Sequence, residues 1–134
     1  MVGRSVSFVT EKEEAQPKEV VLQISDLVVN ENRGVPAVKE LSIDVRAGEI
    51  VGIAGIDGNG QSELIQAITG LRKVKSGSIK IKGQEVVGLS SRKITEMNVS
   101  HVPEDRHRDG LVLEMMLSEN IALQTYYKEP LSKN

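Results

Sequence analysis

The sequence predicts an α/β fold in which a β-strand, a glycine-rich loop and a helix follow one another. The run EIVGIAG at 49–55 is rich in the apolar residues typical of a buried strand. Three glycines then follow at positions 55, 58 and 60. Apolar residues with helical spacing come next: Leu64, Ile65, Ile68 and Leu71. This arrangement is suited to binding phosphate, because backbone N–H groups converge in the loop and a helix N-terminus favours an anion.

The residues before the loop predict a linker and two antiparallel strands. Residues 1–18 are charged, contain a proline and lack apolar periodicity, so we expect a flexible linker there and a folded domain over 19–134. Val20–Val29 predicts the first strand, and residues 30–34 predict a turn. Ala37–Val45 alternates in part and predicts the return strand, after which Ala47 and Gly48 turn the chain into the loop strand.

The residues after the loop helix predict a further antiparallel strand. Together with the first two strands it forms an antiparallel β subdomain, which we expect to comprise residues 20–45 and 78–87. Ser78–Lys82 alternates, with Ile79 and Ile81 predicted to face inward and the lysines outward. The basic run over 72–82 is therefore interpreted mainly as a solvated strand face. A nucleic-acid surface is the less favoured alternative.

Shorter elements are predicted in the last third of the chain. Ser90 is expected to cap a helix that ends at Met97. Residues 99–102 predict a strand, and residues 103–110 a charged loop. A final helix is predicted over 115–127, with Ser118 as its cap.

Composition narrows the function classes. The chain has 134 residues, a net charge of −2, 2% aromatic residues and no cysteine. Few aromatics and no basic excess argue against a nucleic-acid partner. The absence of cysteine excludes disulfides and thiolate metal sites. No apolar run reaches the roughly 20 residues of a membrane span.

The glycine-rich loop matches the pattern G-x-x-x-x-G-K-[ST] of P-loop NTPases except at one position. Gln61 stands where the pattern has lysine, and Ser62 stands where a hydroxyl would reach Mg²⁺. The loop thus has the shape of a phosphate site but lacks its cation, and two carboxylates lie beside it. The predicted cofactor-binding residues are Gly55, Asp57, Gly58, Asn59, Gly60, Gln61, Ser62 and Glu63.

Three other interpretations of the loop remain open. Asp57-Gly58 and Asn59-Gly60 are hairpin signals, although the helical spacing that follows opposes them. A dinucleotide fingerprint would need a glycine at the position of Glu63. The third interpretation is a strand, turn and helix that bind nothing.

Several segments together resemble an ATP-binding cassette (ABC) over about Val20 to Leu123. These are DLVVNENRGVPAVKELSIDVRAGEIVGIAGIDGNGQSEL, SGSIKIKG and VSHVPEDRHRDGLVLEMMLSENIAL. More narrowly, GIDGNGQSEL and VPEDRHRDGLV resemble the second cassette of duplicated ATPase subunits that import simple sugars or nucleosides. In that cassette the lysine is characteristically replaced. The resemblance implies a P-loop ABC ATPase core fragment, with residues 1–18 continuing from a preceding cassette.

The resemblance also implies ATP and Mg²⁺ as cofactors, with weak or absent binding by this chain. Ser62 and Glu104 are the implied Mg²⁺ ligands, Glu104 standing where most cassettes have glutamine. Family cassettes stack adenine on an aromatic ring, but here Asn30-Glu31-Asn32 occupies that region. The signature motif, the catalytic carboxylate and the switch histidine are expected beyond Asn134, so no catalytic residue is assigned.

Two function classes follow from the resemblance. One is the ATPase component of an importer, to which this segment contributes part of a degenerate site. The other is a structural or regulatory half that binds no nucleotide and only pairs with its catalytic twin and the permease. A GTPase is disfavoured because no N-K-x-D motif occurs. The expected location is cytoplasmic, peripheral at the inner face of the cell membrane.

The expected partners are the other cassette of the same longer chain and membrane permease subunits. Residues Pro103–Gln124 are the expected permease contact, because apolar and methionine residues there adjoin a charged rim. The alternative is that these apolar residues belong to the core of a lobe.

Overall fold

The computed structural model describes residues 14–123, 125–129 and 131–132. The described chain divides into two compact units, the first ending at Val99 and the second beginning at Ser100. Residues 14–18 have no regular structure and are exposed, and the rest of the predicted linker, residues 1–13, lies outside the described residues.

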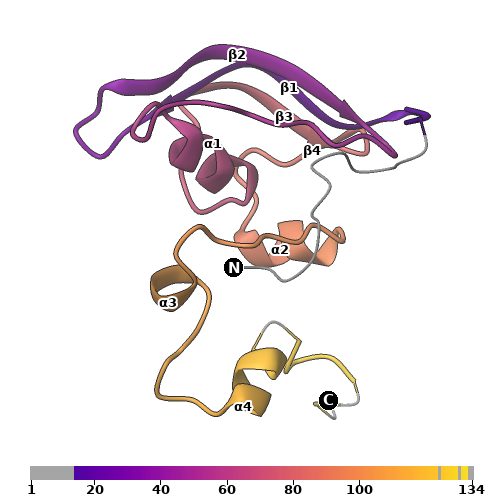
Figure 1. The fold of residues 1–134 in the computed structure, drawn as a ribbon, viewed down its shortest axis with the longest axis vertical. Helices are drawn as coiled ribbons and strands as arrows, with labels where there is room; N and C mark the ends of the chain where they lie inside the picture. Colours follow the sequence, from indigo (N-terminus) through magenta and orange to yellow (C-terminus); the bar gives the residue numbers. More distant parts are fainter. Residues whose placement is uncertain (1–13, 124, 130, 133–134) are drawn as a thin grey trace, which may run out of the picture. The chain divides into compact units, whose positions relative to one another are not determined.

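The first unit contains a four-stranded antiparallel sheet (Figure 1). Its strand order is β2-β1-β3-β4. The strands are β1 (Val20–Asn30), β2 (Pro36–Arg46), β3 (Ser76–Ile81) and β4 (Gln84–Glu85). The predicted antiparallel subdomain is thereby confirmed, including the turn between the first two strands and the inward direction of Ile79 and Ile81.

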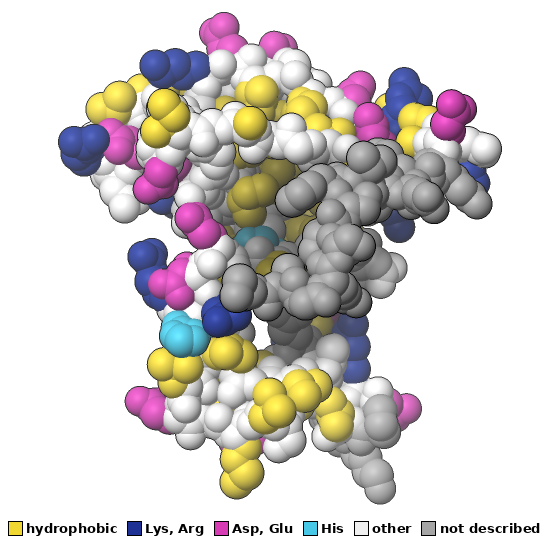
Figure 2. Space-filling view, in the orientation of Figure 1, with side chains coloured by type: hydrophobic (Ala, Val, Ile, Leu, Met, Phe, Trp, Pro, Cys, Tyr) yellow, Lys and Arg dark blue, Asp and Glu magenta, His cyan; other side chains and the backbone are white. Residues whose placement is uncertain are grey.

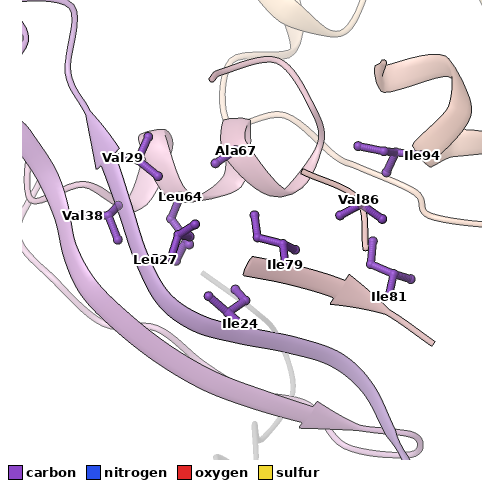
Figure 3. Packing of buried hydrophobic residues seen from close by; sticks show 10 residues of the cluster. All are labelled: Ile24, Leu27, Val29, Val38, Leu64, Ala67, Ile79, Ile81, Val86 and Ile94. Atoms are coloured by element: carbon purple, nitrogen blue, oxygen red, sulfur yellow. The ribbon is translucent and has the colours of Figure 1, made fainter. Parts of the chain in front are cut away.

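One face of the sheet is covered by helix α1 (Gln61–Ile68), which confirms the predicted loop helix. Leu64 and Ala67 of α1 are buried against aliphatic residues of β1, β2 and β3 (Figure 3). The sheet contributes Ile24, Leu27, Val29, Val38, Ile79 and Ile81 to this core. With so few aromatic residues in the chain, these aliphatic side chains supply most of the hydrophobic stabilisation.

Helix α2 (Ser91–Glu96) follows the sheet and begins as predicted. The Ser90 hydroxyl accepts a hydrogen bond from the Lys93 N–H at 3.5 Å, and Met97 is the C-cap. Ile94 is buried in the same cluster as Val86. The cap and the apolar anchor together explain why this short segment is helical.

Two predicted strands are wrong. Residues 49–55 and 99–102 have no regular structure, and Ile50 and Val102 are 99% and 90% exposed. A strand requires hydrogen bonds to a neighbouring strand, and none pairs with either segment in the described part of the chain. Their apolar composition therefore favours extended backbone, but without a neighbouring strand to pair with, neither segment forms a strand.

The second unit contains two short helices. Helix α3 (Arg106–Asp109) lies within the predicted charged loop, where the Asp105 carboxylate caps it by accepting from the N–H groups of His107 and Arg108. Helix α4 (Leu117–Ala122) is shorter than the predicted helix over 115–127.

The predicted cap of α4 is also wrong, because the helix begins after Met116 and not at Ser118. The Glu119 carboxylate accepts the Met116 N–H at 2.8 Å, which satisfies a donor at the helix start. The Asn120 amide donates to the carbonyls of Val112 and Met115, so this side chain ties the helix to the preceding turn. No helix among the described residues is long and apolar enough to cross a membrane.

The Glu85 carboxylate joins β4 to β3 through several hydrogen bonds. It accepts from the Ser78 hydroxyl and from the backbone N–H groups of Ile79 and Val87, both at 3.1 Å. Burial raises the pKa of Glu85, but the hydrogen bonds outweigh it, and the pKa lies below its ordinary value of about 4.5.

We predict that Glu85→Gln lowers stability at pH 7 by up to about 1 kcal/mol, because Glu85 is exposed. A depressed folded pKa contributes stability above the unfolded pKa, and this contribution is lost as pH falls from about 4.5 through the lower folded value. The difference in the free energy of unfolding between wild type and Glu85→Gln should therefore become smaller in acid. Urea unfolding between pH 3 and 7 measures this difference, with the exposed-site variant Asp44→Asn as the control. A difference independent of pH would contradict the prediction.

Candidate functional site

The glycine-rich loop leads from the exposed segment at 49–55 into α1. Gly58 and Gly60 have φ angles of 83° and 95°, the left-handed region that favours glycine. The Asn59 N–H donates to the Ile56 carbonyl at 3.3 Å and closes a tight turn. The backbone conformation is thus the concave, glycine-dependent turn that the motif predicts.

Gly60 fixes the position of the loop against the sheet. This residue is buried and is the N-cap of α1. A Cβ atom on Gly60 would lie 2.5 Å from the Ala37 carbonyl oxygen of β2. Only glycine therefore allows β2 and the start of α1 to approach this closely.

The helix start is open to a ligand in shape. No side chain caps α1 at Gly60, and the first N–H groups of any helix have no acceptor within the helix. Ser62 is exposed in the first turn, and Glu63 is half-buried beside it. The helix N-terminus favours an anion, whereas the Glu63 carboxylate opposes one.

Gln61 occupies the inner side of the loop. Its side-chain amide lies against Gly55, so that a Cβ atom on Gly55 would collide with it. The Gln61 Nε2 atom donates to the Ile56 carbonyl at 3.4 Å, a long and weak hydrogen bond. At this position the loop thus carries a neutral amide, which contacts the loop's own backbone.

A cavity of about 320 Å³ adjoins the loop. Its lining combines the loop and α1 with β2, including Ala37, Lys39, Gly55, Asn59, Gly60 and Gln61. Lys39 is one of the lining residues, and the motif did not predict a cation there. Lys39 lies about 20 residues before the loop in the sequence. Only the packing of β2 beside Gly60 shows that Lys39 and the loop are neighbours.

The structure brings together the predicted phosphate-binding residues Gly55 to Glu63 in one turn and helix start. Glu104, the second implied Mg²⁺ ligand, is exposed and belongs to the other unit, so its pairing with Ser62 stays a prediction. His101 and His107 are also exposed. Among the described residues, no three acidic, histidine or cysteine side chains cluster as a metal site.

The fold and the loop together define an ATP-binding cassette. The ABC transporter family model matches residues 38–132. The chain therefore belongs to the ABC transporter family, and it has the P-loop NTPase fold of an ABC ATPase.

Two bacterial proteins are close relatives. The chain is 70% identical over 133 residues to the nucleoside import ATP-binding protein NupA of Lactococcus lactis subsp. cremoris. It is 58% identical over 132 residues to the guanosine import ATP-binding protein NupO of Bacillus subtilis. These matches cover 99% and 98% of this chain but 26% of each relative, so the chain spans about a quarter of their length.

Solved structures agree on the fold. A nucleotide-free ATP-binding cassette from an ABC transporter aligns over 87% of this chain and 49% of its own, with a TM-score of 0.62 and 17% identity. The protein cbiO1 from Clostridium perfringens, part of an ABC transporter complex, aligns over 60% of this chain and 32% of its own. Its TM-score is 0.53 and its identity is 27%.

We predict that Gln61→Lys alone will not give the loop strong nucleotide affinity. Asp57 and half-buried Glu63 remain beside the position that the phosphates would occupy, and like charges at close range repel. Adding Glu63→Thr should tighten Mg-ATP binding by about tenfold over the single variant. Calorimetric titration measures both variants, with Glu114→Gln, which lies in the other unit, added to Gln61→Lys as the matched control. Equal affinities for Gln61→Lys with and without Glu63→Thr would show that the carboxylate is irrelevant.

Proposed function

We propose that this chain is part of the ATP-binding subunit of an ABC importer that drives the uptake of nucleosides or simple sugars. The observation that carries the proposal is the glycine-rich loop at the start of α1, in a chain closely similar to nucleoside import ATP-binding proteins. Similarity to ribose import ATP-binding proteins, at 36% identity for one from Lactococcus lactis, supports the broader class that includes sugars.

Within that subunit we propose that the segment belongs to a degenerate second cassette. Three features support this placement: Gln61 replaces the phosphate-binding lysine, Glu63 adds negative charge, and no aromatic residue stands at 30–32. A hydrogen bond to a charged group contributes about 1.5–3 kcal/mol, so the lysine replacement alone weakens phosphate binding by one to two orders of magnitude. The partner cassette would lie in the same longer chain.

The backbone shape of the loop suits the phosphates of ATP with Mg²⁺, whereas the neutral Gln61 and the Glu63 carboxylate do not suit their negative charge. The backbone of Gly58 to Gly60 and the start of α1 would hold the phosphates, and Lys39 borders the adjoining cavity. The Ser62 hydroxyl and, by family likeness, Glu104 would supply oxygen ligands to Mg²⁺, the donor type that this ion prefers. When bound, the metal would neutralise phosphate charge.

A second candidate is a structural or regulatory half that binds no nucleotide. The position of the Gln61 amide favours this candidate. The amide contacts Gly55 and the Ile56 carbonyl, so the inner side of the loop is taken up by the protein's own side chain and not by a phosphate. In this case the chain would act only through its contacts with the catalytic cassette and the permease.

Titration with Mg-ATP tests these two functions. For the degenerate importer site we expect no saturation at micromolar concentrations, weak binding at about millimolar concentrations, and no hydrolysis above blank by this chain alone. Binding should be lost in Gly58→Val, which places a β-branched residue at a positive φ. No binding at any concentration would favour the structural half. Micromolar affinity or turnover would contradict the degenerate site.

The permease contact is proposed over Pro103–Gln124, of which Gln124 lies outside the described residues. Large apolar side chains are exposed in this unit, and Figure 2 shows apolar residues gathered at its surface. Within the described residues of the proposed contact, 103–123, the most exposed are Leu113, Met116, Leu117 and Ile121, each at 68–75%. Exposed apolar patches mark interaction sites, and methionine adapts its shape to a partner. On this proposal the protein lies in the cytoplasm, peripheral at the inner face of the cell membrane.

We predict that Met116→Glu in the full-length protein weakens co-purification with the permease at least fivefold and leaves the cassette folded, because Met116 is 72% exposed. Val35→Glu is the matched control, since Val35 is 54% exposed in the β1–β2 turn of the other unit. Circular dichroism checks the folding of both variants. If Met116→Glu unfolds the cassette, these residues are core, and the docking proposal fails.

A further inference from the structure

A second cavity lies beyond the far end of α1 and is lined by cations. It measures about 400 Å³, within the range of roughly 300–1,000 Å³ typical of small-molecule sites. Its lining consists of Asn30, Arg72, Lys73, Val74 and Lys75. It shares no residue with the cavity beside the glycine-rich loop.

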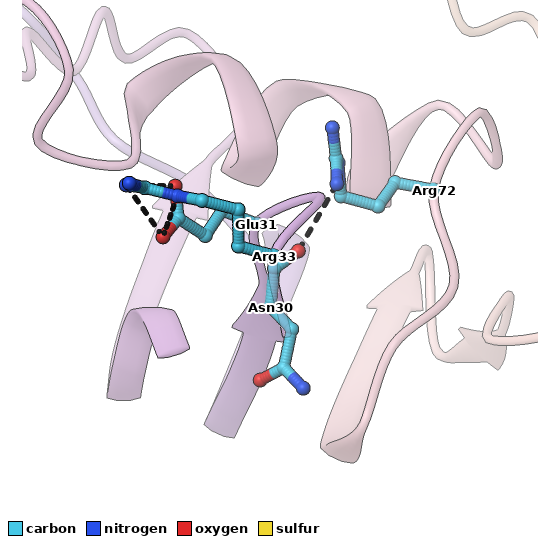
Figure 4. A network of polar contacts seen from close by, with 4 residues as sticks. All are labelled: Asn30, Glu31, Arg33 and Arg72. Atoms are coloured by element: carbon cyan, nitrogen blue, oxygen red, sulfur yellow. Dashed lines mark hydrogen bonds and ion pairs between the residues drawn. The ribbon is translucent and has the colours of Figure 1, made fainter. Parts of the chain in front are cut away.

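Arg72 is held in place by neutral acceptors only. Its Nε atom donates to Gln66 Oε1 at 2.8 Å, and its Nη1 atom donates to Asn32 Oδ1 at 3.0 Å. The Nη1 atom also donates to the Asn30 carbonyl at 3.1 Å (Figure 4). The Asn30 amide points away from Arg72, so only its carbonyl takes part. The Arg72 Nη2 donors have no partner among these hydrogen bonds, although the guanidinium is already oriented.

Among the described residues, no ion pair neutralises the cations that line this cavity. Glu31 is the closest acidic residue in sequence to Asn30, and it is paired with Arg33 at 3.0 Å. In the described structure, none of the ion pairs includes Arg72, Lys73 or Lys75. The C-terminus of α1 contributes about half a negative charge, which offsets only a fraction of three cations.

The backbone around the cavity is fixed. The Lys75 N–H donates to the Val28 carbonyl of β1 at 2.9 Å, and the Arg72 N–H donates to the Gln66 carbonyl at 3.0 Å. The site therefore begins and ends on ordered elements, and Arg72 needs no rearrangement to bind. Pre-organised donors bind an anion better than mobile ones, since less conformational entropy is lost.

We propose that Arg72, Lys73 and Lys75 form a binding site for a phosphate group, separate from the glycine-rich loop. Arg72 Nη2 donates to phosphate oxygens, the geometry in which arginine recognises phosphate, and the two ammonium groups neutralise the charge. The group belongs either to a free phosphorylated molecule or to the headgroup of an anionic lipid. Both sources present the same chemistry to the cavity.

The test is a titration of the ¹⁵N-labelled protein with inorganic pyrophosphate, followed by NMR. We expect saturable shifts of the Arg72 and Lys75 amides, and the Gly58 amide reports separately on the loop. The affinity should fall at least about fivefold in Lys73→Gln/Lys75→Gln, which keeps the hydrogen bonds of Arg72. Arg72→Gln should reduce it by about tenfold. The matched control is Lys80→Gln/Lys82→Gln, which removes the same charge from exposed positions at β3.

A second arm separates the two sources. Vesicles of phosphatidylglycerol in phosphatidylcholine are compared with phosphatidylcholine alone, by sedimentation. Binding to the anionic vesicles that is lost in Lys73→Gln/Lys75→Gln and kept in Lys80→Gln/Lys82→Gln supports a lipid headgroup. Pyrophosphate shifts without vesicle binding support a free phosphorylated molecule.

Two results would overturn the proposal. One is that sodium chloride at equal ionic strength reproduces the pyrophosphate shifts, which would mean simple screening. The other is that the Lys80→Gln/Lys82→Gln control loses as much affinity as Lys73→Gln/Lys75→Gln, which would mean that net charge alone attracts the anion.

Discussion

The close packing of α1 on the antiparallel sheet is the constraint on which the phosphate-binding loop depends. Leu64 and Ala67 are buried against the sheet, and at the helix start Gly60 lies directly on the Ala37 carbonyl. Burial of one large aliphatic side chain contributes about 1.5–3 kcal/mol. These contacts hold the end of the loop at a fixed place, although the strand expected before it is not formed. The loop geometry is therefore supported from its helical side.

Local sequence patterns predicted the part of the fold that local interactions determine. Alternation identified β1, β2 and β3 and the buried directions of Ile79 and Ile81, and the serine at 90 identified the start of α2. The failures at 49–55 and 99–102 have a common cause. Apolar β-branched residues favour extended backbone, but pairing depends on a distant partner that the pattern of one segment does not reveal. The exposure of Ile50 and Val102 is the visible consequence.

The glycine spacing predicted the loop and its helix but not the arrangement of charge and amide groups around them. The position of the Gln61 amide against Gly55 depends on its rotamer, and the place of Lys39 depends on how β2 packs beside Gly60. Arg72 was interpreted as part of a solvated basic run. Its contacts with Asn30 and Asn32 join residues about 40 positions apart, so only the tertiary structure could show that this cation is oriented.

At each end of α1 the nearby side-chain charges have the opposite sign to the partial charge of the helix dipole. The N-terminus, which favours anions, carries Glu63 and adjoins Asp57, whereas Arg72 and its two neighbouring lysines follow the C-terminus. With about 1.5 Å per residue, the eight residues of α1 separate these ends by about 12 Å. That distance exceeds the Debye length of about 8 Å at physiological salt, so each end acts on a ligand nearly independently. On the proposal of a phosphate site at Arg72, side-chain charge at each end of α1, more than the half-charge of the dipole, decides where this domain attracts phosphate.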